Sequence, residues 1–356
     1  MRIEENKLLA PFTTFGIGGP ARWFVEAESE EDVAEAAAWA GDHGMPLFAL
    51  GGGSNLLVSD SGFNGLILRV GLRGVAAEDA SAQPGQRVYQ VAAGEDWDHF
   101  VERTVQDQCA GVECLAGIPG TVGGTPVQNV GAYGQEVASA IERVRAFDLL
   151  EHRFGEFQAS ECGFAYRRSR FNSMDRGRFV VTRVDYRLSP GGTPTVRYAD
   201  LRRALAEREA AAGEPSLAEV AAVVRRVRQA KGMLMVEGDP DCSSAGSFFK
   251  NPVVAEEQIR QIAAAGAKEP PRFPAGPGAE NMGRVKVPAA WLIEQAGFSK
   301  GYTLGAAGIS SRHTLALINR GAASAAEVLA LAGQISAEVE ARFGIRLEME
   351  PVMIGF

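Results

Sequence analysis

The stretch LFALGGGSNLLV, residues 47–58, governs how the rest of the chain is interpreted. An apolar run of strand length meets three consecutive glycines, then Ser54 and Asn55, and then a second apolar run. Consecutive glycines allow positive φ and let a ligand approach the backbone amides, which can together form an anion-binding concavity. Ser54 and Asn55 add side-chain donors. The stretch predicts a phosphate or pyrophosphate site, and a tight turn between two strands is the competing interpretation.

Bulk composition narrows the class of protein. A chain of 356 residues with 46% hydrophobic content predicts two or three domains. No apolar run reaches the ~18 residues of a membrane span, and residues 1–7 lack the apolar core of a signal peptide. A soluble cytoplasmic protein is therefore expected.

Charge, cysteines and histidines exclude several kinds of site. The net charge of −8 argues against a broad nucleic-acid or membrane surface, although local cations could still bind a small anion. The four cysteines form no C-x-x-C pair and predict no disulfide framework. The four histidines are scattered along the chain, and no metal site is predicted.

Two further segments are rich in glycine. TTFGIGGP, residues 13–20, forms an early glycine-rich turn. Residues 117–134 contain six glycines, a density that suits neither a stable helix nor a filled strand. Backbone packed closely against a flat or extended ligand is expected there, with a long structured loop as the alternative.

The periodicity predicts a mixed α and β chain. Helix starts are marked by residue pairs three apart, the first member capping the helix, at Ser29 and Asp32, Ser216 and Glu219, and Ser324 and Glu327. Strands are predicted at residues 22–26, 66–70, 87–94, 143–149 and 179–188, and a helix at residues 96–108. The tail, residues 345–351, alternates apolar and charged side chains and predicts a strand with Arg346, Glu348 and Glu350 on one face. Arg225, Arg226 and Arg228 are expected on the polar face of their helix.

Seven blocks in this order resemble the UDP-N-acetylenolpyruvoylglucosamine reductase family. They are TFGIGG (14–19), LGGGSNLL (50–57), GIPGTVGG (117–124), QNVGAYG (128–134), YRRS (166–169), AGSFFKNP (245–252) and LEME (347–350). The glycine blocks alone would indicate only the wider superfamily of vanillyl-alcohol-type FAD enzymes. The AGSFFKNP and LEME blocks point to the reductase.

The resemblance implies an α+β fold with a two-part FAD-binding region and a C-terminal α+β substrate domain. The implied boundaries are 1–71, 72–215 and 216–356, and the last strand can return to the FAD region. Residues 198–201, YADL, resemble the tyrosine-bearing insertion of the longer type of this family.

The resemblance also implies non-covalent FAD, NADPH as hydride donor, and a UDP-sugar substrate. The implied FAD-binding residues are Gly51, Gly52, Gly53, Ser54, Asn55, Thr121, Val122, Gly123, Gly124, Gly131, Ala132 and Tyr133. The implied substrate-binding residues are Tyr198, Arg228, Lys231, Asn251 and His313. The protein is expected to act as a monomer, without nucleic-acid or membrane partners.

The implied reaction reduces the enolpyruvyl ether of UDP-N-acetylglucosamine to a lactyl ether in peptidoglycan precursor synthesis. Arg167 would stabilise the enolate-like charge and grip the substrate carboxylate. Ser247 would donate the proton to C2, acting by position and relay, and Glu350 would share or orient that proton. Pro351 departs from the family pattern and leaves Glu348 as an alternative to Glu350.

Two other functions stay open at this point. One is an FAD-dependent oxidase of the same superfamily acting on a hydroxy acid or sugar, which would react rapidly with oxygen. The other is a non-catalytic regulator that binds FAD or a nucleotide without turnover.

Overall fold

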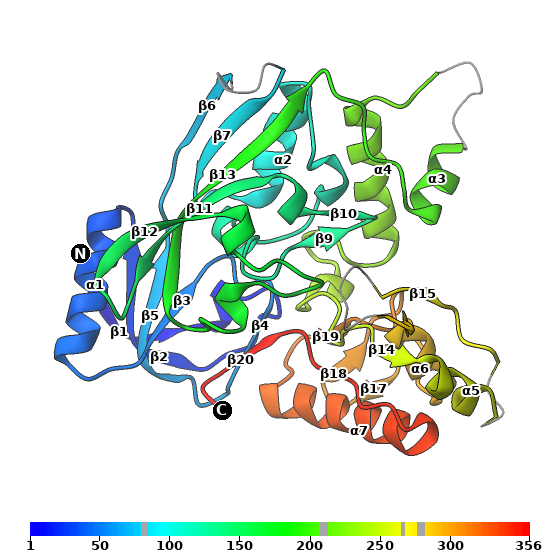
Figure 1. Ribbon diagram of the computed structural model, residues 1–356. Helices are drawn as coiled ribbons and strands as arrows, with labels where there is room; N and C mark the ends of the chain where they lie inside the picture. The colour runs from blue at the N-terminus through cyan, green and yellow to red at the C-terminus, as the bar shows by residue number, and fades with distance from the viewer. Residues whose placement is uncertain (80–84, 207–212, 265–267, 276–281) are drawn as a thin grey trace. The chain divides into compact units, whose positions relative to one another are not determined.

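The computed structural model describes residues 1–79, 85–206, 213–264, 268–275 and 282–356 (Figure 1). The chain divides into two compact units. The first unit comprises Met1–Lys7, Ala21–Gly53 and Asn64–Ala230, and the second comprises Leu8–Pro20, Ser54–Phe63 and Lys231–Phe356. The predicted boundaries at residues 71 and 215 remain a prediction.

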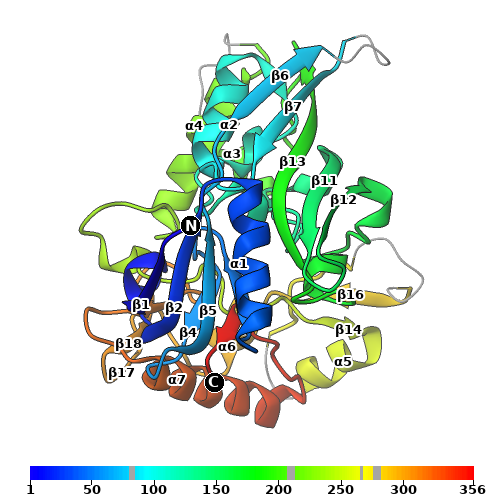
Figure 2. The ribbon, with the colours of Figure 1, turned by 90° about the vertical axis from the view of Figure 1, so that its left-hand side faces the viewer.

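A four-stranded sheet in the order β1-β2-β5-β3 opens the first unit. Its strands are β1 (Ile3–Leu8), β2 (Pro20–Ala27), β5 (Phe63–Val70) and β3 (Leu47–Leu50). The helix α1 (Glu30–Asp42) lies along this sheet (Figure 2). As predicted, Ser29 caps α1 by accepting a 3.1 Å hydrogen bond from the Asp32 amide, and the apolar stripe of the helix is buried.

A larger antiparallel sheet follows in the order β12-β11-β13-β7-β6, with β8 pairing to the end of β13. Its strands are β6 (Val75–Asp79), β7 (Arg87–Ala92), β8 (Cys109–Ala110), β11 (Ile141–Asp148), β12 (Arg153–Gln158) and β13 (Phe179–Pro190). The prediction found the long strands β7, β11 and β13 but missed β1, β6 and β12. Neither β6 nor β12 has a fully buried side chain, so neither strand has a continuous apolar face to mark it in the sequence.

The described residues of the first unit also form the helices α2 (Trp97–Gln106), α3 (Ala199–Ala206) and α4 (Leu217–Ala230). The predicted pair at the start of α4 is confirmed, because the Ser216 amide and the Ser216 hydroxyl both donate to Glu219. Val220, Val223 and Val224 of α4 are buried in the same core as Trp97 of α2. Each such aliphatic side chain contributes about 1.5–3 kcal/mol by leaving water.

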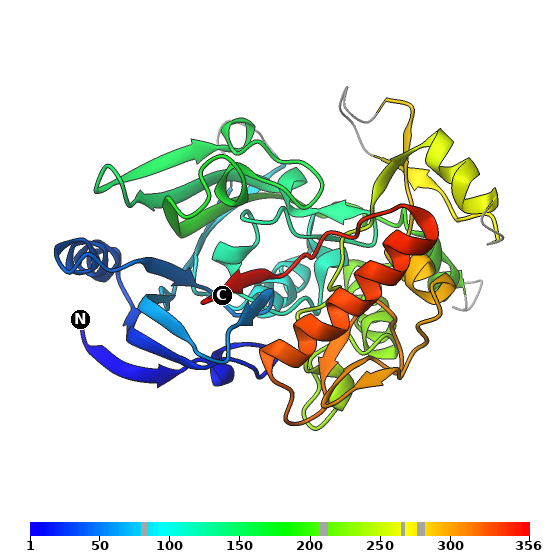
Figure 3. The same ribbon diagram turned by 90° about the horizontal axis from the view of Figure 1, so that it is seen from below.

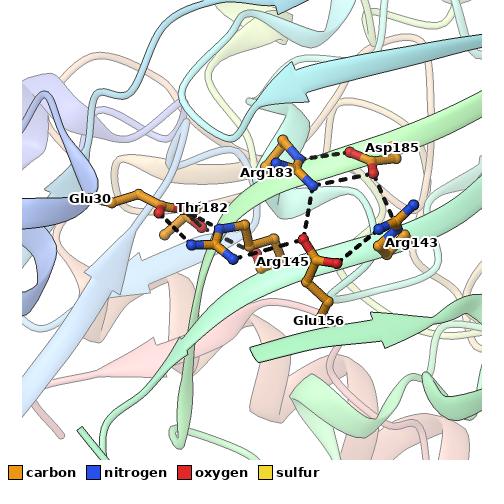
Figure 4. A network of polar contacts seen from close by, with 7 residues as sticks. All are labelled: Glu30, Arg143, Arg145, Glu156, Thr182, Arg183 and Asp185. Atoms are coloured by element: carbon orange, nitrogen blue, oxygen red, sulfur yellow. Dashed lines mark hydrogen bonds and ion pairs between the residues drawn. The ribbon is translucent and has the colours of Figure 1, made fainter. Parts of the chain in front are cut away.

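A network of charged side chains ties α1 to the larger sheet (Figure 4). Arg145 on β11 donates two 2.8 Å hydrogen bonds to Glu30, the first residue of α1. Thr182 on β13 donates to the same carboxylate at 2.7 Å. Beside them, burial raises the pKa of Asp185 although Arg183 hydrogen-bonds it. The bidentate Arg145–Glu30 pair fixes the start of α1 against the sheet.

The described residues of the second unit form short strands and three α-helices. A three-stranded sheet contains β14 (Val253–Ala255), β16 (Arg284–Lys286) and β15 (Phe273–Pro274). Another contains β17 (Thr303–Leu304), β18 (Ala307–Ile309) and β19 (Leu317–Asn319). The helices are α5 (Glu256–Ala264), α6 (Ala289–Gln295) and α7 (Ala325–Phe343).

The helix α7 supplies much of this unit's core and leads into the tail (Figure 3). Its predicted start is confirmed, because Ser324 and Glu327 form a reciprocal capping box. Gly344 caps the other end of the helix with φ 64°, a conformation that glycine adopts without strain. The core side of α7 includes Val328, Leu331, Ile335 and Val339.

The prediction of a strand at residues 345–351 is wrong. Only Met349 forms an isolated bridge, to Phe249, and the terminal strand β20 (Val352–Ile354) begins after Pro351. Burial still alternates as predicted, with Ile345 and Leu347 inside and Arg346 and Glu348 exposed. Alternation reports which side chains face the core, but a strand also needs a neighbour to pair with over its length.

The strand β20 pairs in parallel with β4 (Leu56–Val58), which directly follows the glycine-rich stretch. The last strand of the chain therefore lies beside residues near its start. No helix in the described part of the chain is long and apolar enough to cross a membrane.

Candidate active site

Two glycine-rich segments meet in the first unit. A Cβ added to Gly51 would lie 2.8 Å from the Thr121 hydroxyl oxygen, and one added to Gly52 would lie 2.5 Å from the Cα of Gly120. Real Cβ atoms do not approach so closely, so the contact between backbones at Gly52 requires glycine, and a Cβ at Gly51 would displace the Thr121 hydroxyl. Gly53 adopts φ 64°, the left-handed conformation that glycine reaches most easily. The stretch after β3 is therefore more than a turn between two strands of one sheet: β3 pairs with β5, whereas β4 pairs with β20.

Unused hydrogen-bonding groups mark this contact as a cradle for a ligand. The hydroxyl of Thr121 is buried and has no hydrogen-bond partner among the described residues. The backbone amides of Gly52 and Gly53 likewise donate no hydrogen bond to any described residue. Buried polar groups are normally satisfied, and donors beside glycines suit an anion. The residues present thus fit the pyrophosphate of FAD.

The amides of residues 122–124 are used inside the protein. Val122 donates to the Glu95 carbonyl at 2.9 Å, Gly123 to the Ala93 carbonyl at 2.8 Å, and Gly124 to the Thr121 carbonyl at 3.0 Å. This segment can therefore assist a ligand through the Thr121 hydroxyl and through close approach rather than through a row of open amides.

The early glycine-rich turn, residues 13–20, has a packing explanation in the second unit. A Cβ on Gly19 would collide with the Asp60 carbonyl, and one on Gly18 would lie 2.9 Å from the Cβ of Val58. Thr14 donates a 2.6 Å hydrogen bond to the Ser244 carbonyl. The glycines here let the turn pack against its neighbours.

Arg167 lies at the tip of a tight turn in the first unit. Ala165 and Arg168 exchange backbone hydrogen bonds of 2.9 and 3.0 Å, and Arg167 between them has φ 54°. An arginine in the left-handed region costs on the order of 1–2 kcal/mol. Such strain persists only where the surroundings over-determine it, and it clusters at functional sites.

Arg228, which was expected on the polar face of its helix, is buried beside Tyr133. Its exposed fraction is 6%, and its Nε donates a 2.9 Å hydrogen bond to the Gly117 carbonyl. Burial lowers the pKa of Arg228 and the charge of Arg167 adds to this, whereas the interaction with Tyr133 opposes it. The Tyr133 ring packs edge-on against Tyr198 with centroids 5.7 Å apart. The first unit thus brings together two arginines and two tyrosines.

Ser247 and Glu350 belong to adjoining backbone segments of the second unit. The Glu350 amide donates a 2.9 Å hydrogen bond to the carbonyl of Phe248, the residue after Ser247. The Lys250 amide donates to the Glu348 carbonyl at 2.9 Å, which completes the pairing. The side-chain amide of Asn55 donates to the Glu350 carbonyl at 3.3 Å. At least one predicted FAD-site donor is therefore also used to hold the tail.

The two candidate carboxylates differ in their surroundings. The side chain of Glu348 is 72% exposed and pairs with Lys250 at 2.5 Å. Glu350 is half-buried. A solvated ion pair is the ordinary state of a surface glutamate, so the environment favours Glu350 as the functional carboxylate.

The second unit also contains His313, Lys231 and Asn251. Burial, reinforced by the charges of Lys231 and Lys300, lowers the pKa of His313 to about 4, so its imidazole is neutral near pH 7. The side-chain oxygen of Asn251 accepts a 2.8 Å hydrogen bond from the Ala289 amide at the start of α6. His313 and Asn251 can thus offer a ligand hydrogen bonds but no charge, and Lys231 can offer a cation.

Sequence reasoning missed two residues that shape the site. Asp98 on α2 accepts a 2.5 Å hydrogen bond from the Gly117 amide. Because the two residues lie in separate segments of the sequence, no local pattern predicted this contact. Asn129 is 99% buried, with an exposed fraction of 1%, and could have been found because a polar residue stands there inside a glycine-rich block. Among the described residues no group of three or more His, Cys, Asp or Glu could hold a metal ion.

The chain is similar to known proteins over nearly its whole length. The family profile described as "UDP-N-acetylenolpyruvoylglucosamine reductase, C-terminal domain" matches residues 239–354, and an FAD-binding domain profile matches residues 21–153. The chain is 45% identical to the UDP-N-acetylenolpyruvoylglucosamine reductase of Streptomyces coelicolor, over 98% of this chain and 89% of the relative. It is 43% identical to that of Thermobifida fusca, over 99% and 98%. A crystal structure of the Thermus caldophilus reductase has a TM-score of 0.66 at 26% identity and covers 99% of both chains.

Proposed function

The chain belongs to the UDP-N-acetylenolpyruvoylglucosamine reductase family, and we propose from that premise how its residues carry out the reduction of UDP-N-acetylglucosamine enolpyruvate to UDP-N-acetylmuramate. The protein is an FAD-containing, NADPH-dependent oxidoreductase. The observation that carries this conclusion is the 45% identity to a reductase over 98% of the chain. The contact between Gly51, Gly52 and Thr121 supports it independently.

The cradle holds the cofactor through three short segments. Residues 51–55 and Thr121 to Gly124 would lie at the pyrophosphate, and Gly131 to Tyr133 along the flavin. FAD held by these residues would supply hydride transfer, chemistry that amino-acid side chains cannot perform. The protein contributes placement, and the glycine contacts at residues 51 and 52 leave little freedom in that placement.

Arg167 stabilises the negative charge that develops on C2 and on the carboxylate of the substrate. A guanidinium can bind a carboxylate through two parallel hydrogen bonds, and fixed positive charge is most effective where charge develops in the transition state. The strained turn at Arg167 (φ 54°) supports this role, because strain of this kind is associated with functional residues.

Ser247 delivers the proton to C2 and Glu350 assists it. A serine hydroxyl is a weak acid, so it needs a partner that orients it or replaces its proton. The hydrogen bond from the Glu350 amide to the Phe248 carbonyl supports this pairing, since it fixes the two backbone segments beside each other.

The remaining polar residues bind the UDP-sugar. Lys231 and Arg228 supply the positive charge that an anionic ligand needs on a protein of net charge −8. His313 contributes a neutral hydrogen-bonding imidazole, and Tyr198 and Asn251 contribute polar groups. Tyr198 is 39% exposed, which leaves part of its ring available for contact.

The proposal extends to the cellular setting. The reaction belongs to peptidoglycan precursor synthesis and so to cell shape and division, and the protein acts in the cytoplasm as a monomer. Full-length relatives that carry the reductase name support the first statement. The oxidase and regulator alternatives are not favoured by the same relatives.

An anaerobic half-reaction tests the proposed function. The FAD-loaded protein is first bleached with NADPH, and UDP-N-acetylglucosamine enolpyruvate is then added in stoichiometric amount. Return of the oxidised flavin spectrum is expected. If the colour returns only when air is admitted, the oxidase alternative replaces the proposal, and if NADPH never bleaches the flavin, the regulator alternative does.

A further inference from the structure

The turn that carries Arg167 is held by side chains from two places in the first unit. Asn172, five residues along the chain, donates a 3.2 Å hydrogen bond to the Arg167 carbonyl. The Ser169 hydroxyl donates to the Val127 carbonyl at 2.7 Å. Asn129 donates a 3.0 Å hydrogen bond to the Ala165 carbonyl. The Asn172 contact is local and shapes the turn, whereas Asn129 reaches it from a separate segment.

Asn129 uses its whole carboxamide in this arrangement. Besides the bond to Ala165, its side-chain nitrogen donates to the Glu136 carboxylate at 2.9 Å. Its side-chain oxygen accepts from the Ala138 amide at 3.1 Å. Two donors and one acceptor are thus satisfied in a residue that is 1% exposed, which is the condition under which a buried amide specifies one geometry.

The same residue ties the turn to a second part of the site. Tyr133 lies in the hairpin of β9 (Gly131–Ala132) and β10 (Gln135–Glu136), in which Glu136 pairs with Gly131. Asn129 precedes this hairpin and bonds to Glu136 at its far end. One side chain therefore connects the hairpin that carries Tyr133 with the turn that carries Arg167.

We infer that Asn129 is a positioning residue that sets the place of the Arg167 guanidinium through the Ala165 carbonyl. The inference rests on the proposed function, since it assumes that Arg167 acts on the substrate. Loss of the Asn129 side chain leaves the Asn172 bond to Arg167 and the Ser169 bond to Val127 in place, but it removes the bonds that join Ala165 to Glu136 of the hairpin. A shift of about 1 Å in a catalytic group can lower a rate by about 10²-fold.

The test uses Asn129→Gly, because Asn129 has φ 44° and glycine keeps that conformation while removing the carboxamide. Asn6→Gly is the matched control, since Asn6 is an exposed asparagine with φ 53°. In Asn129→Gly, substrate-dependent reoxidation of reduced flavin is expected to slow by about 10–100-fold. Bleaching by NADPH is expected to keep its wild-type rate. Asn6→Gly is expected to match the wild type in both steps.

A double-mutant cycle with Arg167→Lys separates positioning from general damage. If Asn129 acts through Arg167, Asn129→Gly will change the rate in the Arg167→Lys background by less than about threefold, well under its effect alone. An equal factor in both backgrounds overturns the inference. Hydrogen exchange of the peptide covering residues 162–170 gives a readout without turnover and is expected to accelerate in Asn129→Gly.

Asn129→Asp keeps the test decisive if Asn129→Gly folds poorly. It preserves the size and the acceptor for Ala138, but it replaces both donors with a carboxylate facing Ala165 and Glu136, so a rate loss of the same order is expected. Wild-type reoxidation in this variant overturns the inference. If Arg167→Lys reoxidises its flavin with substrate at the wild-type rate, the inference loses its premise that Arg167 acts on the substrate. If the flavin of the wild-type protein is not reoxidised by substrate, the proposed function itself is overturned.

Discussion

The backbone amide of Glu350 donates a 2.9 Å hydrogen bond to the carbonyl of Phe248, the residue that follows Ser247. A residue six positions from the C-terminus is thereby fixed beside a block about one hundred residues earlier in the chain. Asn55, just after the three glycines, donates from its side chain to the Glu350 carbonyl and accepts from the Val352 amide at 2.9 Å. Three blocks that are distant in sequence thus share one hydrogen-bonded junction in the second unit.

Replacement of Ser247 by alanine is expected to slow substrate reduction selectively. The rate of substrate-dependent flavin reoxidation should fall by about 10²–10⁴-fold, the usual contribution of a positioned general acid. Reduction by NADPH should keep its rate, because that step needs no proton at C2 of the substrate. Stopped-flow absorbance measures the two half-reactions separately.

Ser336→Ala is the matched control for that experiment, since Ser336 is a half-buried serine on α7 whose hydroxyl oxygen is buried. Both half-reactions should keep their wild-type rates in this variant. If the rate of substrate-dependent flavin reoxidation fell equally in the two serine variants, Ser247 could not be assigned as the proton donor.

The tail carboxylates can be distinguished by a matched pair of amide substitutions. Glu350→Gln removes the charge without changing the shape and is expected to lower the rate of substrate reduction by about 10²-fold or more. Glu348→Gln removes an exposed ion pair with Lys250, which contributes little, and should stay within about twofold of the wild type. Steady-state kcat under saturating NADPH measures both, and the reverse ranking would assign the function to Glu348.

The glycine contact predicts a loss of FAD binding in Gly52→Ala. The added Cβ would lie 2.5 Å from the Cα of Gly120, so the two segments must separate, at about 1–3 kcal/mol. Gly41→Ala is the control, because a Cβ at that position in α1 meets nothing within 4 Å and alanine favours a helix. Flavin fluorescence during titration with FAD measures the affinity. Wild-type affinity in Gly52→Ala would show that the contact is not part of the cradle.

The low pKa of His313 predicts a specific pH dependence of stability. Burial and the charges of Lys231 and Lys300 lower that pKa to about 4, whereas an unfolded histidine titrates near about 6.5. Between these values the unfolded chain binds the extra proton. The contribution of a neutral His313 to the free energy of unfolding is therefore complete above about pH 6.5. It is lost as the pH falls toward 4, at up to about 1.4 kcal/mol per pH unit.

His313→Gln isolates this contribution from that of the carboxylates, which titrate in both proteins. Urea unfolding is measured from pH 7 to pH 4 with FAD in constant excess, because bound ligand stabilises the native state. The free energy of unfolding should fall less steeply with decreasing pH in the variant than in the wild type. Parallel curves would mean that His313 does not stay neutral when it is buried.

Local sequence was sufficient for the elements whose signals are short-range. The residue pairs at Ser29, Ser216 and Ser324 located three helix starts, since a capping hydrogen bond joins residues three apart. The end of α7 is also local, because Gly344 adopts the left-handed conformation that glycine reaches without strain. Glycine-rich blocks located the segments that need close backbone approach, and the order of the blocks indicated the family that full-length relatives then showed.

Tertiary structure decided what depends on partners far along the chain. The tail alternates like a strand, yet the strand that forms is β20, because residues 352–354 pair with Leu56–Val58. Arg228 looked solvated in its helix but is buried against Gly117, more than one hundred residues away. In the sequence, Asn129 is only a polar residue among glycines. Its hydrogen bond to the Ala165 carbonyl forms because the hairpin and the turn lie together in the fold. Periodicity in the sequence reflects which side chains of a segment share one face. Burial and strand pairing depend instead on which segment, distant in the sequence, packs against that face. The order of residues along the chain does not show directly which distant segment that is.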